Sequence, residues 1–147
     1  MSQAKILTDM ETLFTALSDQ TRLRLLNLIR NEEVCVCFFV EALDESQPKI
    51  SRHLAYLRKA GLVETRRDGK WMHYKLSMPE DENLQNIINE TLNRLAQSDQ
   101  MRGDYERLVA ACCSPEAPVT ISRAPKPEAL VSAIAEEAQE ELETFLL

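Results

Sequence analysis

Apolar residues recur at intervals of three and four along most of the chain, a spacing that predicts a mainly α-helical protein. The apolar stripes of the predicted helices lie at 10–17, 23–29, 36–43, 50–57, 84–95 and 101–109. Ser18 or Asp19 can cap the second helix. Ser46 can cap the fourth helix, which has Pro48 in its first turn and stops at Gly61.

A change of period after the fourth helix predicts a β-hairpin. Two runs that favour strands, 62–67 and 71–76, flank the turn signal Asp68-Gly69. The order of helix, short helix, helix and hairpin is that of a winged helix-turn-helix protein. The predicted fold class is therefore mainly α with a small β-hairpin.

The last third of the chain predicts additions to this domain. Four prolines between 115 and 127 mark a linker, and the apolar residues of 131–145 are spaced as in an acidic amphipathic helix. The expected units are residues 1–97 as the winged helix-turn-helix domain, 98–114 as a helical extension ending in Cys112-Cys113, and 115–147 as the linker and acidic helix.

The distribution of charge favours a nucleic-acid partner despite a formal net charge of −7. Between residues 45 and 77, eight basic side chains face three acidic ones, whereas the acidic residues concentrate after residue 127. No apolar run approaches the roughly 18 residues of a membrane span, and the first ten residues lack the features of a secretory signal. We therefore expect a cytoplasmic protein with no membrane partner.

The fourth helix is the predicted reader of double-stranded DNA. Its apolar side faces the core, so its basic and polar side chains point outward, and the hairpin adds further basic groups. The candidate DNA-binding residues are Gln47, Lys49, Ser51, Arg52, His53, Tyr56, Arg66, Arg67 and Lys70. The helix alone has the composition of an ordinary solvated face, but the basic hairpin favours DNA.

Several of these segments resemble the ArsR/SmtB family of repressors. The matching segments are Ser46-Gln47-Pro48-Lys49-Ile50-Ser51-Arg52-His53-Leu54, Ala60-Gly61-Leu62-Val63, Asp68-Gly69-Lys70-Trp71 and His73-Tyr74. The resemblance covers residues 13–76 in detail and extends to 95 in pattern. It implies a homodimer that binds operator DNA through two protomers, joined by the first and last helices, and that loses operator affinity on binding metal. We expect Ile88 and Leu92 in the dimer interface.

The four cysteines form two close pairs, Cys35-Val36-Cys37 and Cys112-Cys113, which in a reducing compartment indicate metal or redox chemistry. The first pair resembles the Cys-Val-Cys box of the arsenic-responsive branch of the family. That resemblance implies that Cys35 and Cys37 bind As(III) or Sb(III) as inducer. A third cysteine of the family box would fall on Val40. Cys112 and Cys113 are therefore candidates for the third ligand, for an independent thiol site, or for no role in sensing.

Ligand chemistry supports this interpretation. Soft trivalent arsenic prefers thiolates, whereas zinc readily takes imidazole, and the chain has only two histidines, neither of them in 84–95, where the zinc sensors of the family carry ligands. In a regular helix Cys35 and Cys37 would diverge by about 200°. We therefore expect binding to distort the first turn of the third helix and to strain the reading helix beside it.

Several other functions stay open. The same fold could carry a Cd(II)- or Pb(II)-responsive repressor, a thiol-redox-responsive repressor, or an adaptor that acts through the acidic tail. The cysteines could also be two buried small hydrophobic residues. An enzyme is not expected, because Cys-x-Cys in a helix-turn-helix lacks the Cys-x-x-Cys motif and α/β pattern of a disulfide reductase.

Overall fold

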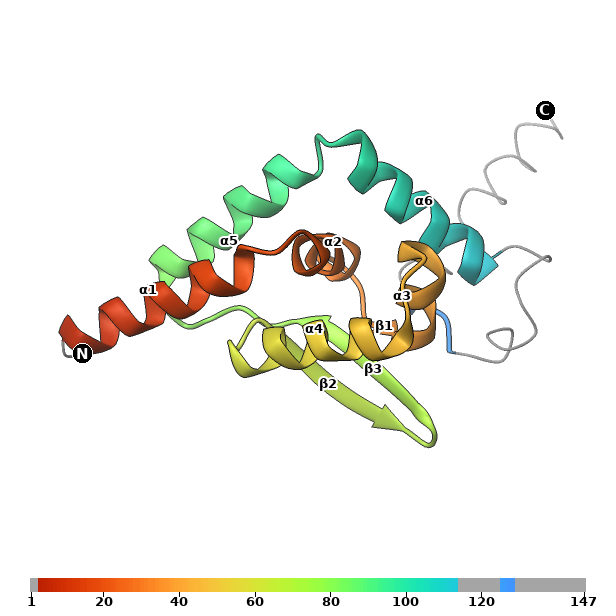
Figure 1. The fold of residues 1–147 in the computed structure, drawn as a ribbon, viewed down its shortest axis with the longest axis horizontal. Helices are drawn as coiled ribbons and strands as arrows, with labels where there is room; N and C mark the ends of the chain where they lie inside the picture. The colour runs from red at the N-terminus through yellow and green to blue at the C-terminus, as the bar shows by residue number, and fades with distance from the viewer. Residues whose placement is uncertain (1–2, 114–124, 129–147) are drawn as a thin grey trace, which may run out of the picture.

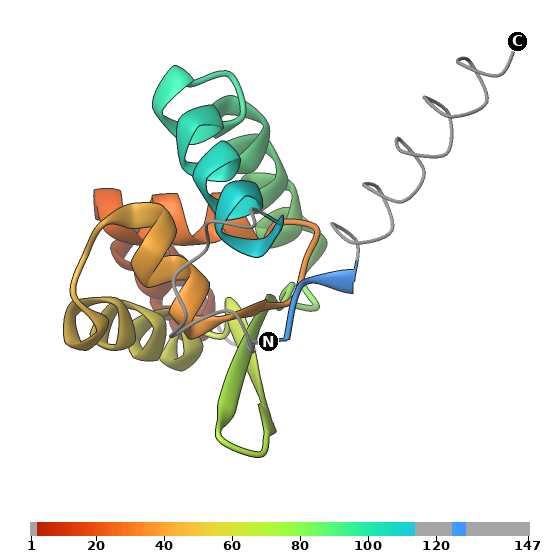
Figure 2. The same cartoon turned by 90° about the vertical axis from the view of Figure 1, so that its right-hand side faces the viewer.

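The computed structural model describes residues 3–113 and 125–128 of the 147-residue chain. Its elements are α1 (Gln3–Leu17), α2 (Gln20–Ile29), β1 (Val34–Cys35), α3 (Val36–Leu43), α4 (Gln47–Lys59), β2 (Val63–Asp68), β3 (Trp71–Leu76), α5 (Glu82–Leu95) and α6 (Asp99–Cys113). The β2–β3 hairpin projects from the helical body as a wing (Figure 1 and Figure 2). The predicted winged helix-turn-helix fold is confirmed, and the predicted acidic helix of 131–145 lies outside the described residues.

Local signals set the ends of the two central helices as the sequence predicts. The side chain of Asp19 caps α2 by accepting the backbone N–H of Arg22 at 3.1 Å. The Ser46 hydroxyl accepts the backbone N–H of Lys49 at 3.4 Å and caps α4. Gly61 follows α4 with φ +80°, a left-handed conformation that costs glycine nothing.

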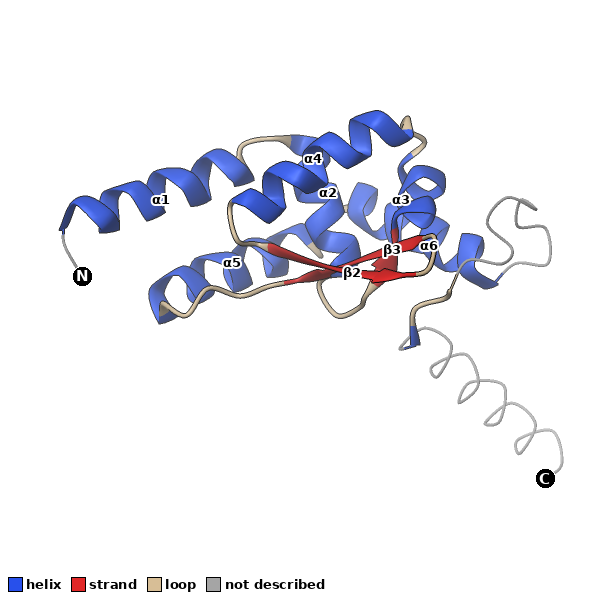
Figure 3. Ribbon diagram, turned by 90° about the horizontal axis from the view of Figure 1, so that it is seen from below, coloured by secondary structure: helices blue, strands red, loops and turns tan. Residues whose placement is uncertain are grey.

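The wing belongs to a sheet of three strands, whereas the sequence predicted a hairpin alone. The strands lie in the order β1-β3-β2 and are antiparallel. Figure 3 shows the paired strands β2 and β3 in red. In the third strand, β1, Val34 lies opposite Tyr74 and Cys35 lies opposite His73. The predicted turn is also displaced by one residue, because Asp68 still pairs with Trp71 and the chain reverses after it. The segment that carries the first cysteine is thus an edge strand of the wing sheet.

The apolar stripe of α5 packs mainly into its own protomer. Ile88 and Leu92 are 1% and 4% exposed and belong to the core formed with α2. Their expected place in the dimer interface is therefore wrong, because a periodic apolar stripe does not say which partner covers it. The large apolar side chains that stay exposed on α1 are Ile6, Leu7 and Phe14.

Helix α6 folds back onto α2 and α3 (Figure 1). Asp104 is completely buried there, and both of its carboxylate oxygens accept hydrogen bonds from Arg24, at 2.8 and 2.9 Å. Arg107 also pairs with Asp104 and donates to the backbone oxygen of Ala42 at 2.8 Å. These contacts fix α6 against α2 and α3, the helices that precede α4.

None of the described helices is both long and apolar enough to span a membrane.

Candidate functional site

The predicted DNA-binding residues of α4 lie beside its buried face of Ile50, Leu54 and Leu57. Gln47, Arg52 and Tyr56 are exposed, and Lys49, Ser51 and His53 are half-buried. Lys49 pairs with Glu45 at 2.8 Å, one turn earlier. Within the described part of the chain, the guanidinium of Arg52 makes no hydrogen bond or ion pair. Among the candidate residues of α4, Arg52 is therefore the basic side chain that is most available to a base edge or phosphate.

Two of the six α4 candidates also hold α4 against α2. The Nδ1 atom of His53 lies 3.4 Å from Nη1 of Arg22 and 3.7 Å from a carboxylate oxygen of Asp19. The Arg22 guanidinium stacks 4.3 Å from the ring centroid of Tyr56. Arg22, which the sequence did not single out, thus positions α4 through contacts with His53 and Tyr56.

The wing candidates differ in their surroundings. Arg66 lies within β2 rather than at the tip, and its Nε donates to Oε1 of Glu33 at 2.9 Å. This hydrogen bond lowers the pKa of Glu33. Arg67 bends back to the Gly69 carbonyl at 3.3 Å, and Lys70 lies 4.9 Å from the ring centroid of Trp71. Arg67 and Lys70 are exposed beside the turn, where they can reach phosphates.

Cys35 and Cys37 lie together at the start of α3. Cys35 is the N-cap residue, with φ −71° and ψ 142°, and its side chain makes no capping hydrogen bond. The helix therefore begins after Cys35, and the two Sγ atoms are 3.4 Å apart. The expectation that binding must distort a regular helix is wrong, because extended backbone at Cys35 already turns its thiol toward Cys37.

A hydrogen bond joins the two thiols. The Cys37 thiol donates to Sγ of Cys35, and this hydrogen bond lowers the pKa of Cys35 to about 7, helped by the backbone N–H groups of Cys37, Met72 and Val36. The same hydrogen bond, together with burial, raises the pKa of Cys37. Cys35 is completely buried and Cys37 is half-buried. The pair thus combines a thiolate near neutral pH with a partner that a reagent can approach.

The second cysteine pair is on α6. Cys112 is buried in the core that also contains Cys35, whereas the side chain of Cys113 lies outside what the structure describes. Among the residues whose side chains are described, no three His, Cys, Asp or Glu groups are placed to hold one ion together. Cys112 therefore does not complete a three-ligand cluster with Cys35 and Cys37 in this structure.

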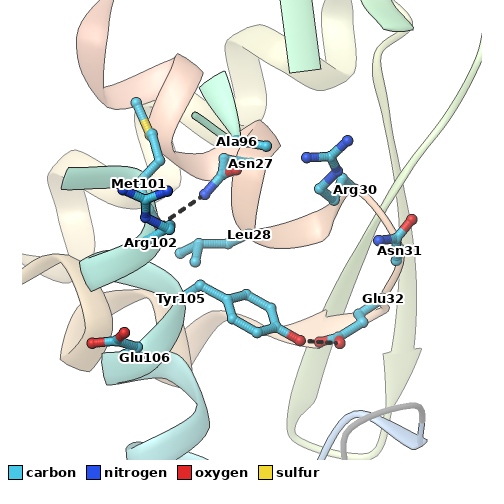
Figure 4. A pocket seen from close by; sticks show the side chains of 10 residues that line it. All are labelled: Asn27, Leu28, Arg30, Asn31, Glu32, Ala96, Met101, Arg102, Tyr105 and Glu106. Carbon is cyan, nitrogen blue, oxygen red and sulfur yellow. Dashed lines mark hydrogen bonds between the residues drawn. The ribbon is translucent and has the colours of Figure 1, made fainter. Parts of the chain in front are cut away.

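A cavity of about 380 Å³ separates α6 from the segment that leads to the first cysteine pair (Figure 4). Across it, the Tyr105 hydroxyl donates to Oε1 of Glu32 at 2.9 Å. Burial and this hydrogen bond raise the pKa of Tyr105 to about 12, and burial raises the pKa of Glu32. The contact ties α6 to the chain three residues before Cys35.

Comparison with known proteins supports a regulatory role. Residues 19–65 match the family described as "Bacterial regulatory protein, arsR family". The Arsenic resistance transcriptional regulator ArsR1 of Pseudomonas putida KT2440 is 40% identical over 111 residues, which cover 72% of this chain and 82% of that protein. The chain belongs to the ArsR family. ArsR-family proteins are DNA-binding transcription regulators, so the expectation of a regulator rather than an enzyme agrees with this membership.

Two further similar proteins are matched to different extents. The Arsenical resistance operon repressor of Escherichia coli K12 is 56% identical over 66 residues, which cover 44% of this chain and 56% of that protein. The solved structure of HlyU from Vibrio cholerae N16961 has a TM-score of 0.54 and 30% identity, and the match covers 66% of this chain and all of that one. The match to the E. coli repressor thus spans little more than half of its length.

Proposed function

We propose that this ArsR-family protein represses transcription by binding operator DNA as a homodimer, and that As(III) or Sb(III) bound by Cys35 and Cys37 releases it. The observation that carries the proposal is the 3.4 Å distance between the two Sγ atoms. They lie at the start of α3, the helix that precedes the proposed reading helix α4. Relatives named as arsenic-resistance regulators support a metalloid inducer.

We also propose that residues 98–114 and 115–147 are additions to a DNA-binding and dimerisation domain of residues 1–97.

The chemistry of the pair suits an arsenite-type ligand. Each thiol gives its proton to a hydroxyl of arsenous acid, that hydroxyl leaves as water, and an As–S bond replaces the As–O bond, so arsenic stays trivalent. Two adjacent thiols take two of its three bonds, and a hydroxyl or a further thiol such as Cys112 or Cys113 takes the third. Soft thiolate ligands favour this ion over hard cations.

A titration of the operator complex tests the proposal. Fluorescence anisotropy of labelled operator DNA is followed as arsenite, antimonite, Cd(II), Zn(II) or hydrogen peroxide is added to the full chain. Release by the two metalloids at concentrations that leave the complex intact with Zn(II) supports it. Release by Cd(II) alone, or by peroxide alone, would instead establish one of the alternative inducers. Of these, oxidation of the two thiols is favoured by the same short Sγ–Sγ distance.

We expect basic residues of α4 and of the wing to affect operator binding in different ways when they are replaced. Arg52→Ala is expected to weaken operator binding by about 1–3 kcal/mol and to relax sequence preference, because its exposed guanidinium is placed to reach base edges. Arg67→Ala is expected to weaken all sequences alike and to reduce the salt slope by about 1. Binding is measured over a range of salt, with Arg94→Ala on α5 as a control of equal charge. Equal binding by all three variants would show that the DNA face is assigned wrongly.

Helix α1 offers exposed apolar side chains for the proposed dimer interface, since Leu7 and Phe14 are 73% and 51% exposed. Leu7→Glu combined with Phe14→Glu leaves the core of the protomer intact but would bury charge in an interface, so monomers are expected. Sedimentation velocity measures the change, and circular dichroism checks that the helices persist. Operator affinity should fall with dimerisation, because two half-sites need two reading helices. A monomeric wild-type protein would refute the homodimer.

A further inference from the structure

Strand β1 joins the candidate cysteine site to the wing. Its two residues, Val34 and Cys35, pair with β3, and Cys35 lies directly opposite His73. On the other side of β3, Arg66 of β2 is also opposite His73. Directly opposed residues of antiparallel strands share a face, so Cys35, His73 and Arg66 form one row across the sheet.

An ion pair crosses this row. Glu33, which directly precedes β1, accepts hydrogen bonds from Arg66 at 2.9 Å (Nε) and 2.5 Å (Nη2). His73 is only 4% exposed, its Nδ1 lies 3.9 Å from Oε1 of Glu33, and its Nε2 has no hydrogen-bond partner in the described part of the chain. A buried nitrogen without a partner destabilises this closed arrangement relative to one in which water reaches it.

The surroundings leave room for the ion pair to open. A hollow of about 730 Å³ adjoins the pair and is lined by Glu33, Arg66, His73 and Asp68 among others. Arg66 is more than half exposed, so it can leave Glu33 without displacing a packed side chain. The backbone N–H of Met72, in β3, is one of the groups that lower the pKa of Cys35. A change at the Cys35 sulfur therefore also reaches the central strand directly.

We propose that the wing is the direct output of the cysteine site, and that Glu33 is the positioning residue that transmits ligand binding at Cys35 and Cys37 to Arg66. Ligand that joins both sulfurs moves Cys35 relative to β3. Glu33, which directly precedes β1, moves with Cys35 and no longer holds Arg66 along the sheet. The wing then loses the arrangement in which Arg66 meets the operator backbone. This inference rests on the proposed function, since it assumes that ligand binds the two thiols.

The test compares Glu33→Ala with Glu64→Ala in the full chain. Glu64 pairs with Lys75 at 3.4 Å between β2 and β3, so its replacement changes the wing charge equally but leaves β1 untouched. The measured quantity is the ratio of operator Kd values with and without saturating arsenite. Glu33→Ala is expected to reduce this ratio by about 2- to 30-fold while arsenite affinity of the DNA-free protein is kept, and Glu64→Ala is expected to preserve the ratio.

A second readout needs no DNA. Trp71 is the only tryptophan of the chain and begins β3, so its fluorescence reports on the wing. In wild-type protein, arsenite is expected to change this emission over the same concentrations that release the operator. An unchanged ratio in Glu33→Ala, a loss of arsenite binding in that variant, or an unresponsive Trp71 at saturating arsenite would overturn the inference. If arsenite fails to release wild-type protein from the operator, the proposed function fails instead.

Discussion

Cys35→Ser and Cys37→Ser are each expected to abolish release by arsenite while operator binding stays nearly unchanged. Serine is almost isosteric with cysteine, and its hydroxyl can face the same backbone N–H groups that lower the pKa of Cys35. A hydroxyl is protonated and hard at neutral pH, however, and is a poor ligand for a soft ion. Wild-type affinity for the operator should fall by about 5- to 150-fold on arsenite addition, as is typical of coupled sites, and the variants should show no fall.

The matched comparison is the double variant Cys112→Ser with Cys113→Ser. If these residues are incidental, its response to arsenite stays that of the wild type. If they supply the third thiolate, more arsenite is needed and X-ray absorption shows two sulfur ligands instead of three, but release at saturation persists. Arsenite-driven release from a Cys35→Ser, Cys37→Ser double variant would move the sensing site away from β1 and α3.

Arg24→Met is expected to lower the free energy of unfolding by about 3 kcal/mol. Asp104 is 0% exposed, and Arg24 supplies hydrogen bonds to both of its carboxylate oxygens, so the change leaves a buried carboxylate with Arg107 as its remaining arginine partner. Removing one partner of a buried ion pair is costly because the other charge stays out of water. Urea unfolding followed by circular dichroism measures the change.

Two variants make that result specific. Arg102→Met removes an exposed ion pair with Asp99 on the same helix and should cost less than about 1 kcal/mol. Arg24→Met combined with Asp104→Leu should recover much of the lost stability, because no unpaired charge stays buried. If Arg24→Met and Arg102→Met destabilise the protein equally, α6 is not held to α2 in the way described.

Local signals in the sequence were sufficient for most of the fold. Asp19 and Ser46 are strong N-caps, Gly61 takes the left-handed conformation after α4, and the apolar periods of the helices and hairpin are clear. The family resemblance added the placement of the first cysteine pair at the start of the third helix. These signals are short-range, so one sequence displays them fully.

The features that the sequence missed depend on longer-range contacts. Strand β1 has only two residues, too few for an alternating pattern, and Cys35 is the N-cap of α3 without a capping hydrogen bond that would mark its extended backbone. The partners Glu33 and Arg66 are 33 positions apart, with no periodic signal to join them. The apolar face of α5 was recognised, but periodicity cannot distinguish a core within the protomer from an interface between two protomers.

A direct test of sensing at Cys35 and Cys37 maps the thiols that an arsenical occupies while the operator is released. Phenylarsine oxide bonds two thiols and needs no third ligand, so it probes the pair alone. Trypsin cleavage after Arg30, Lys49, Arg107 and Arg123 separates the two cysteine pairs into different peptides, and alkylation of the remaining free thiols with mass spectrometry then counts the protected ones.

We predict that protection of both Cys35 and Cys37 rises in proportion to operator release, with one arsenical per protomer. The 3.4 Å separation of their sulfur atoms requires little movement for both to bond to one arsenic. Release accompanied by protection of Cys112 and Cys113 alone, or full protection of Cys35 and Cys37 with the operator still bound, would contradict it.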